Sequence, residues 1–379
     1  MNLLVYTLIT FLLTLDSYYD YNLDIAYLPY FGFFILLIYQ GKIFLNSSKF
    51  SLNELSIPIF ILLSIIPSLF IGIFDLESII SMNKIYALTC GCIVFIIFNR
   101  ISDKSFICIA VRNVILIHLT FFFIQFFAHY IFNYDLDFLS WFSGEKQRTS
   151  VGRIGLPILG SYFRASGLFN EPSTYSSYIT ALYCLISYNK NYEKNNFIEN
   201  SIFLSNLLTF SFHGIFLSMI FYISKLIRSD NKINPIYVIR NLKIKISGII
   251  IFSICFPLFM EIINWVSFRI NTYPEVLQLR LTSLGYLDIY KFYFGNGILN
   301  TAILDQLLGV LVFFLSQVGL FLFLAFLFYV FKIKKSRHLV PLILLGFCKV
   351  TIYSPFIFLA ISSYFKEVEN TQNIKNNFS

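Results

Sequence analysis

The sequence predicts an all-α integral membrane protein that crosses the bilayer about eleven times. Of its 379 residues, 57% are hydrophobic and only 13% are charged, whereas soluble domains are about 45–50% apolar and about 25% charged. The mean hydropathy is +0.74, and apolar runs recur along the whole chain. So few charges cannot cover a water-facing surface, which excludes cytosolic enzymes, disordered chains, collagens and disulfide scaffolds.

The apolar runs give the expected spans, with ten to twelve as the allowed range. The stretch 198–227 is too long for one helix, and the polar residues from Thr209 to Gly214 predict a turn that divides it. The last run contains Lys349 and Pro355 and forms either one kinked helix or two half-helices. The expected spans are 2–16, 25–40, 55–74, 84–99, 113–133, 173–189, 197–210, 212–228, 246–264, 306–331 and 339–364.

Charge predicts the orientation of these spans. The start, Met1 to Leu15, has neither a basic segment nor a small-residue cleavage site, so we expect a retained span rather than a signal peptide. With the N-terminus in the cytoplasm, every inside connection is basic, as cytoplasmic connections are. The placement of the positive charges behind the net charge of +8 therefore indicates the orientation of the spans, and no nucleic-acid partner is expected. The inside cations include Lys42, Lys49, Arg100, Lys104, Arg112, Lys190, Lys194, Lys225, Arg228, Lys232, Arg240, Lys243, Lys245, Lys332, Lys334, Lys335 and Arg337.

The cysteines carry no metal or redox motif. None of the six forms a C-x-x-C pair or has a histidine at zinc-site spacing. Five lie in apolar runs and Cys108 lies in a short basic connection, so buried thiols are expected. No cluster of outside carboxylates has the spacing of metal ligands, and we expect neither a metal nor another cofactor.

Two outside connections, 134–172 and 264–305, are much longer than the rest of the loops in this single membrane domain, 1–379. They carry cations on the face that is usually poor in them, which indicates an anionic ligand. The alternative is that long loops are exempt from the charge bias. These cations are Lys146, Arg148, Arg153 and Arg164 in the first loop and Arg269, Arg280 and Lys291 in the second.

The first long loop has the composition of a phosphate-binding segment. Its glycines allow backbone N–H groups to approach a ligand closely, and Arg148, Arg153 and Arg164 can each match two phosphate oxygens. The absence of G-x-x-x-x-G-K-[ST] from the sequence excludes a nucleotide P-loop. The pattern predicts a phosphate or diphosphate site; the alternative is a glycine-rich connector whose arginines meet lipid headgroups. The glycines are at positions 144, 152, 155, 160 and 167.

A helix is expected to begin at Pro172, because proline suits the first turn and the hydroxyls of Ser173 and Thr174 can cap it. Glu171 would lie at the membrane surface beside the positive end of this helix. Three roles stay open for its carboxylate: it favours the helix dipole, it pairs with Arg164, or it serves as a general base for an attacking hydroxyl.

These residues also carry a resemblance to a known family. The segment Arg164-Ala-Ser-Gly-Leu-Phe-Asn-Glu-Pro-Ser173, which opens a span after a long outside loop, resembles a motif of bacterial O-antigen polymerases of the Wzy type. Weaker resemblances to the same polymerase and ligase group cover residues 145–325 in total. They lie in Leu208-Thr-Phe-Ser-Phe-His-Gly-Ile215, in Arg280 followed by Gly295-Asn-Gly297, and in Ser316-Gln-Val-Gly-Leu320.

The resemblance implies a metal-independent polymerase of the bacterial inner membrane with its active face in the periplasm. Such an enzyme transfers a growing glycan from undecaprenyl diphosphate to the terminal sugar of another lipid-linked repeat, and a chain-length regulator is a further candidate partner. Our hypothesis is that Arg148, Arg153, Arg164 and Arg280 bind the diphosphate, with Glu171 or Asp305 near the acceptor hydroxyl. Arg269 and His213 are further candidate substrate contacts.

Alternatives remain at several positions. His213 is otherwise a polar turn residue, Glu275 and Asp288 are alternative bases or solvated charges, and Lys349 is an intramembrane charge that we leave out of the site. Asp305 and Gln306 stand close to where the histidine of O-antigen ligases would fall, which favours polymerase over ligase. A flippase or other transporter is the remaining alternative, although repeated halves and charges within the spans are lacking.

Overall fold

The computed structural model describes about half of the chain, and the structural statements below concern that half. The described residues are 2–15, 28–45, 52–70, 78–101, 105–143, 146–156, 160–187, 196–229, 293–294, 315, 318–326, 345–348, 350 and 354–362.

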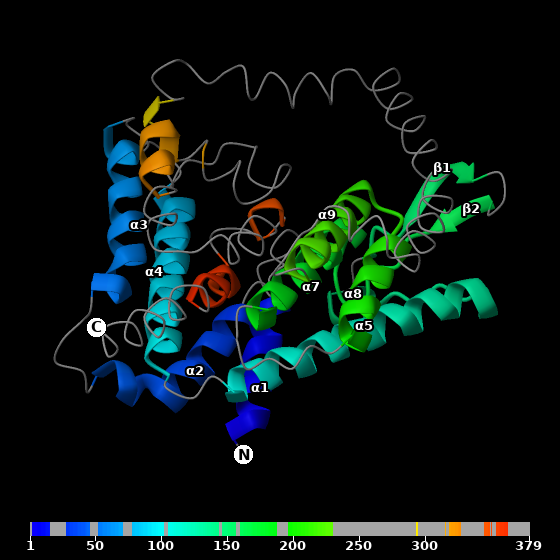
Figure 1. The fold of residues 1–379 in the computed structure, drawn as a ribbon, viewed down its shortest axis with the longest axis horizontal. Coiled ribbons are helices and arrows are strands. Elements are labelled where there is room, and N and C mark those ends of the chain that lie inside the picture. Colours follow the sequence, from blue (N-terminus) through cyan, green and yellow to red (C-terminus); the bar gives the residue numbers. More distant parts are fainter. Residues whose placement is uncertain are drawn as a thin grey trace.

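The described residues form a helical bundle with one small β-ribbon (Figure 1). Its helices overlap the first eight expected spans, so the helical fold class is confirmed, while the number of membrane crossings stays a prediction. The elements are α1 (Asn2–Thr14), α2 (Leu28–Leu45), α3 (Leu52–Phe70), α4 (Ser78–Arg100), α5 (Ser105–Phe132), α6 (Phe138–Ser143), β1 (Ser150–Leu156), β2 (Gly160–Phe163), α7 (Pro172–Ser187), α8 (Asn196–Leu208) and α9 (Phe212–Ser229).

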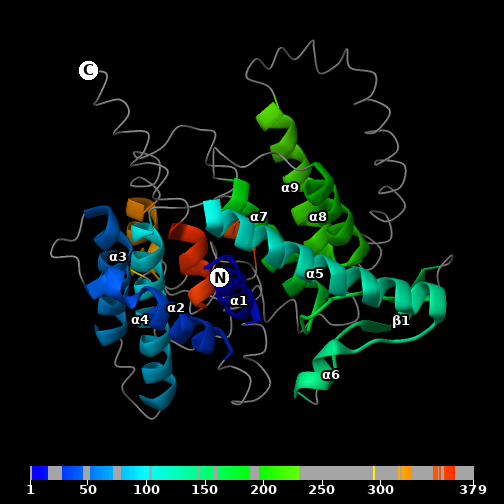
Figure 2. The same cartoon turned by 90° about the horizontal axis from the view of Figure 1, so that it is seen from below.

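Helix α5 is the central element of this arrangement. It lies against α1, α7 and α8, and α7, α8 and α9 run side by side next to it (Figures 1 and 2). Its segment Phe106–Phe132 has 27 residues and is the helix that, by length and composition, could cross a membrane among the described residues. At 1.5 Å per residue it is about 40 Å long. The apolar segments Leu3–Thr14, Leu28–Gly41 and Glu54–Ile65 are shorter.

Helix α5 begins earlier than the sequence predicts. We expected a span from residue 113, preceded by a basic connection that held Cys108 and Arg112; both residues lie within α5 instead. The stretch is apolar before Arg112 and again from Val114 onward, and Arg112 itself is exposed. One exposed cation does not interrupt the backbone hydrogen bonds of a helix, so the helix continues through it.

The last apolar run, 339–364, is helical at 345–347 and at 355–362. Of the described residues between these pieces, Cys348, Val350 and Ser354 are not helical. Ser354 Oγ accepts a hydrogen bond from the Phe356 N–H at 3.2 Å, so Ser354 caps a helix whose first residue is Pro355. Of the two alternatives for this run, the described residues match two helical pieces.

Aromatic side chains form the centre of the core. Phe122 of α5 stacks on Tyr175 of α7 with ring centroids 4.6 Å apart, and Tyr178 stacks between Phe169 and Phe356 at 5.2 Å from each. All five are fully or almost fully buried. Cys90, Cys184 and Cys348 are buried free thiols, while Cys92 and Cys108 are partly exposed.

Candidate functional site

The segment between α5 and α7, residues 133–171, is a folded unit rather than a plain connector. It contains α6 and the antiparallel strands β1 and β2, which the all-α prediction did not include. Ser150 pairs with Phe163 and Leu156 with Gly160, with an irregularity in register between Ser150 and Gly155. In Figure 1 this ribbon lies at the end of the molecule opposite α3 and α4.

The motif from Arg164 to Ser173 connects β2 to α7, and its interior is buried. All six residues between Arg164 and Glu171 are buried, with Ala165, Ser166 and Phe169 at 0% exposure. Phe169 packs 5.0 Å from the His118 ring of α5. The two charged residues of the motif, Arg164 and Glu171, are only partly buried. The motif therefore has a buried interior and two charged side chains that reach its surface.

Two buried glutamines hold this motif on α5. The Gln125 Oε1 atom accepts the Ser166 and Gly167 N–H groups, both at 2.8 Å, while Gln125 Nε2 donates to Leu136 O at 2.8 Å and to Gln147 Oε1 at 2.6 Å. Gln147 Nε2 in turn donates to the carbonyls of Gly167 and Phe169 at 2.7 Å.

Both amides are therefore fully hydrogen-bonded, as buried polar groups need to be. Gly167 has φ +59°, a backbone conformation that favours glycine. Its N–H binds Gln125, so this glycine serves loop packing rather than the close ligand approach that the sequence suggested.

Gln147 also connects the motif to α6. Its backbone N–H donates to Asp137 Oδ2 at 2.9 Å. The other carboxylate oxygen, Asp137 Oδ1, accepts the Ser140 N–H at 2.9 Å and so caps α6. Neither glutamine nor Asp137 was identified from the sequence. Gln125, a single amide within the apolar run Phe121-Phe-Phe-Ile-Gln-Phe-Phe127, was the available signal.

Arg148 and Glu171 form an ion pair at the surface of the motif. The Arg148 N–H donates to Asn170 O at 2.8 Å, which places residue 148 beside the end of the motif. Arg148 Nη1 then donates to Glu171 Oε1 at 2.7 Å, with the two side chains 61% and 35% exposed. Arg164 was one partner that the sequence left open for Glu171, and the ion pair forms with Arg148 instead. The backbone contact to Asn170 brings Arg148 closer.

Arg164 lies on the other side of Arg148. Its N–H donates to Thr149 O at 2.9 Å, and its Nη2 atom lies 3.4 Å from the Arg148 carbonyl oxygen. Arg148 and Arg164 thus converge from two neighbouring chain segments. Arg148 pairs with Glu171 and Arg164 contacts the Arg148 backbone, so this surface carries two cations and one carboxylate, a net positive charge that suits an anionic ligand.

Glu171 is the residue immediately before α7. Its carbonyl accepts the N–H groups of Thr174 and Tyr175 at 3.1 Å, and Pro172 takes the first helical position, as predicted. The Ser173 hydroxyl donates to Glu171 Oε2 at 3.2 Å. The carboxylate therefore accepts hydrogen bonds at both oxygens.

His213 lies in the first turn of α9 and contacts α7. Its Nε2 atom is 2.9 Å from Ser177 Oγ, and Ser177 Oγ donates to the Ser173 carbonyl at 2.9 Å. Because the single hydroxyl proton of Ser177 is directed to Ser173, His213 Nε2 carries the proton and donates to Ser177. This inferred tautomer leaves Nδ1 as the basic nitrogen of the ring.

The turn before His213 is built on a tight hydroxyl cluster. The α8–α9 turn falls at 209–211, within the predicted interval. Thr209 Oγ1 donates to Asn206 O at 2.7 Å, and Ser211 Oγ accepts the Gly214 N–H at 2.9 Å. A side chain at position 214 would collide with Thr209 Oγ1 and lie 2.6 Å from Ser176 Oγ. Glycine at 214 therefore lets α9 approach α7 closely enough for His213 to reach Ser177.

The ribbon is anchored to the end of α5. The Tyr130 hydroxyl donates to Phe163 O at 2.9 Å, and the His129 ring stacks on Phe163 with centroids 4.4 Å apart. His129 also pairs with Asp135. Arg153 belongs to β1 on the same ribbon.

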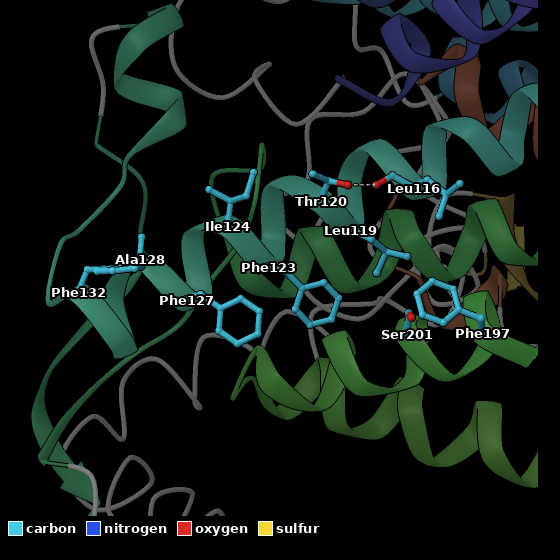
Figure 3. A pocket seen from close by; sticks show the side chains of 10 residues that line it. All are labelled: Leu116, Leu119, Thr120, Phe123, Ile124, Phe127, Ala128, Phe132, Phe197 and Ser201. Atoms are coloured by element: carbon cyan, nitrogen blue, oxygen red, sulfur yellow. Dashed lines mark hydrogen bonds between the residues drawn. The ribbon is translucent and has the colours of Figure 1, made fainter.

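The face of α5 opposite Gln125 forms an apolar groove of about 530 Å³ (Figure 3). Phe197 and Ser201 of α8 complete it, and Thr120 donates its hydroxyl back to Leu116 O at 2.8 Å. Helical periodicity places Gln125 on the side of α5 away from these residues. The groove is lined by Leu116, Leu119, Thr120, Phe123, Ile124, Phe127, Ala128, Phe132, Phe197 and Ser201.

The structure thus brings Arg148, Arg164 and Glu171 together, and His213 of α9 lies against Ser177 of α7. Arg269, Arg280 and Asp305 lie outside the described residues, and so do Glu275, Asp288 and Lys349. Within the described part of the chain, no group of three or more His, Cys, Asp or Glu side chains is arranged to hold a metal ion. In comparisons with known proteins, no family model, curated protein or solved structure matches this chain.

Proposed function

We propose that the protein is a polysaccharide polymerase of the bacterial inner membrane, which acts on undecaprenyl-diphosphate-linked repeat units at the periplasmic face. The observation that carries this proposal is the convergence of Arg148, Arg164 and Glu171 on one packed motif. Guanidinium groups suit the diphosphate of the donor, and a carboxylate nearby suits the acceptor hydroxyl.

The proposed reaction assigns a role to each group. The acceptor sugar hydroxyl attacks the anomeric carbon of the growing glycan, and a new C–O glycosidic bond forms. The bond from that carbon to the carrier phosphate breaks, and its electron pair leaves with undecaprenyl diphosphate. Arg148 and Arg164 stabilise the charge that develops on the leaving group. Glu171 takes the proton of the attacking hydroxyl and later releases it to water; Asp305 is the alternative base.

The proposal includes a chain that spans the membrane about eleven times, with segment 133–171 in the periplasm. Alkaline phosphatase, which is active only in the periplasm, tests this orientation. Fused after Asp135 it should be active, and fused after Arg228 it should be inactive. The reverse pattern would contradict the proposed active face.

Deletion of the gene in its native host tests the function. A polymerase mutant keeps a core with one repeat unit and loses the longer ladder of surface polysaccharide. Loss of the single-repeat band as well would indicate a flippase, and polymer retained on its lipid carrier would indicate a ligase. An unchanged ladder would refute all three.

Complementation of that deletion tests the site. Arg164→Gln, at normal membrane levels, should restore no long polymer, because the leaving group loses one of its cations. Lys146→Gln is the control: Lys146 is an exposed cation of the same segment to which the proposed reaction gives no role, and its loss should leave the ladder intact. Full-length polymer from Arg164→Gln would refute the proposed role of Arg164.

A further inference from the structure

The Arg148–Glu171 ion pair conflicts with the roles that the proposed function gives to its two members. Glu171 Oε1 is bound by Arg148 Nη1 at 2.7 Å and Oε2 by Ser173 Oγ at 3.2 Å. A general base needs an oxygen that can reach the attacking hydroxyl, and here each Glu171 oxygen already accepts one hydrogen bond from the protein. Arg148, for its part, directs one N–H to a carboxylate of the protein instead of a phosphate of the donor.

A carboxylate and a phosphate present similar oxygens to a guanidinium group, and arginine binds either one. The Glu171 carboxylate therefore accepts the Arg148 hydrogen bond that a phosphate oxygen of a ligand would accept. Both side chains reach solvent, at 61% and 35% exposure, so they can separate without unfolding the motif.

The backbone beneath the pair stays fixed during such a separation. Arg148 is held through its N–H on Asn170 O, and Asn170 belongs to the buried interior of the motif. The separation takes place through side-chain torsions of Arg148 and Glu171. A diphosphate carries more negative charge than a carboxylate, and Arg164, which contacts the Arg148 backbone, adds a second cation that attracts it.

From this geometry we infer that the Arg148–Glu171 pair is a resting contact that the donor diphosphate replaces. The phosphate oxygens take the place of the Glu171 carboxylate on Arg148, and the displaced carboxylate turns to the acceptor hydroxyl. Donor binding thereby releases the Glu171 carboxylate to act as the base. Without donor, the same carboxylate occupies the phosphate-binding position on Arg148. This inference rests on the proposed function of the same residues.

A binding cycle with the full-length protein in detergent tests the exchange, with farnesyl diphosphate as the probe. Glu171→Gln removes the competing charge and should tighten binding about two- to fivefold, the worth of an exposed ion pair. Arg148→Gln should weaken binding. In the double variant, Glu171→Gln should bring no gain over Arg148→Gln alone, because nothing is left to compete for. Asp135→Asn removes an exposed charge of the same segment as the control and should leave the affinity unchanged.

Three results would overturn the exchange. These are wild-type affinity in Glu171→Gln, an equal gain from Glu171→Gln in the Arg148→Gln background, and no binding of farnesyl diphosphate by the wild type. The equal gain would indicate a general charge effect instead of competition for Arg148. Because this cycle measures binding, it stays distinct from the gene deletion: an unchanged polysaccharide ladder refutes the polymerase, whatever the affinities are.

Discussion

Replacing Gln125 with leucine keeps the approximate size of the side chain and removes the amide that holds segment 133–171 on α5. Four groups lose their partner: the N–H groups of Ser166 and Gly167, the Leu136 carbonyl and Gln147 Oε1. Hydrogen bonds in membrane proteins are worth about 0.6 kcal/mol each on average. Orphaned buried groups cost about 1–3 kcal/mol each.

The four losses together destabilise the docked segment by about 2 kcal/mol on the lower scale. A cost of that size raises the population of the undocked segment about 30-fold. Proteolysis reports this population when opening and closing are faster than cleavage. Trypsin should therefore cut Gln125→Leu protein after Lys146 or Arg148 about 30-fold faster than wild type.

Gln40→Leu is the matched control for this experiment. Gln40 of α2 donates one hydrogen bond, to the Tyr6 hydroxyl at 2.6 Å, and has no contact with the docked segment. It should leave cleavage at Lys146 and Arg148 unchanged. Equal cleavage rates in Gln125→Leu and wild type would refute the view that the two glutamines hold the motif in place.

Two further predictions concern the α8–α9 turn. Gly214→Ala places a methyl group against Thr209 and should lower the free energy of unfolding by about 1–3 kcal/mol, seen as a lower melting temperature in detergent. Gly41→Ala is the control: nothing lies within 4 Å of the added carbon, so its stability should be unchanged or slightly higher. Equal melting temperatures of the two variants would contradict the tight packing. Ser177→Ala removes the hydrogen-bond partner of His213 Nε2 and should shorten the polysaccharide ladder, with Ser177→Thr restoring it. A normal ladder from Ser177→Ala would show that His213 needs no fixed tautomer.

The sequence predicts the helices of this protein better than their contacts. Apolar runs located α1 to α5 and α7 to α9 because each run reflects the local requirement to bury side chains and satisfy backbone groups. The predicted span begins at residue 113, after Arg112, whereas α5 begins at Ser105, because one exposed arginine is compatible with a helix. The turn at 209–211 was found because polar residues interrupt an apolar run there.

The contacts of the site depend on pairings that local patterns do not contain. Gln125 and Gln147 are 22 residues apart in sequence, and neither has a feature that identifies the other. Pairing with Arg164, the nearest arginine along the chain, was one of three roles that the sequence left open for Glu171. It pairs with Arg148 instead, because the Arg148 N–H binds Asn170 O across the segment. The ribbon of β1 and β2 escaped prediction because its glycines resemble those of an irregular loop.

The buried interior of the motif has a consequence for how the protein can vary in evolution. Six buried residues separate Arg164 from Glu171, and they act as a spacer of fixed length. An insertion or deletion among them would move Arg164 or Glu171 away from Arg148, or would expose the Phe169 ring. The side chains inside the spacer can be exchanged for others of similar volume more easily than their number can change. Distant relatives are therefore better recognised by the interval from the arginine to the glutamate–proline pair than by residue identity along the spans.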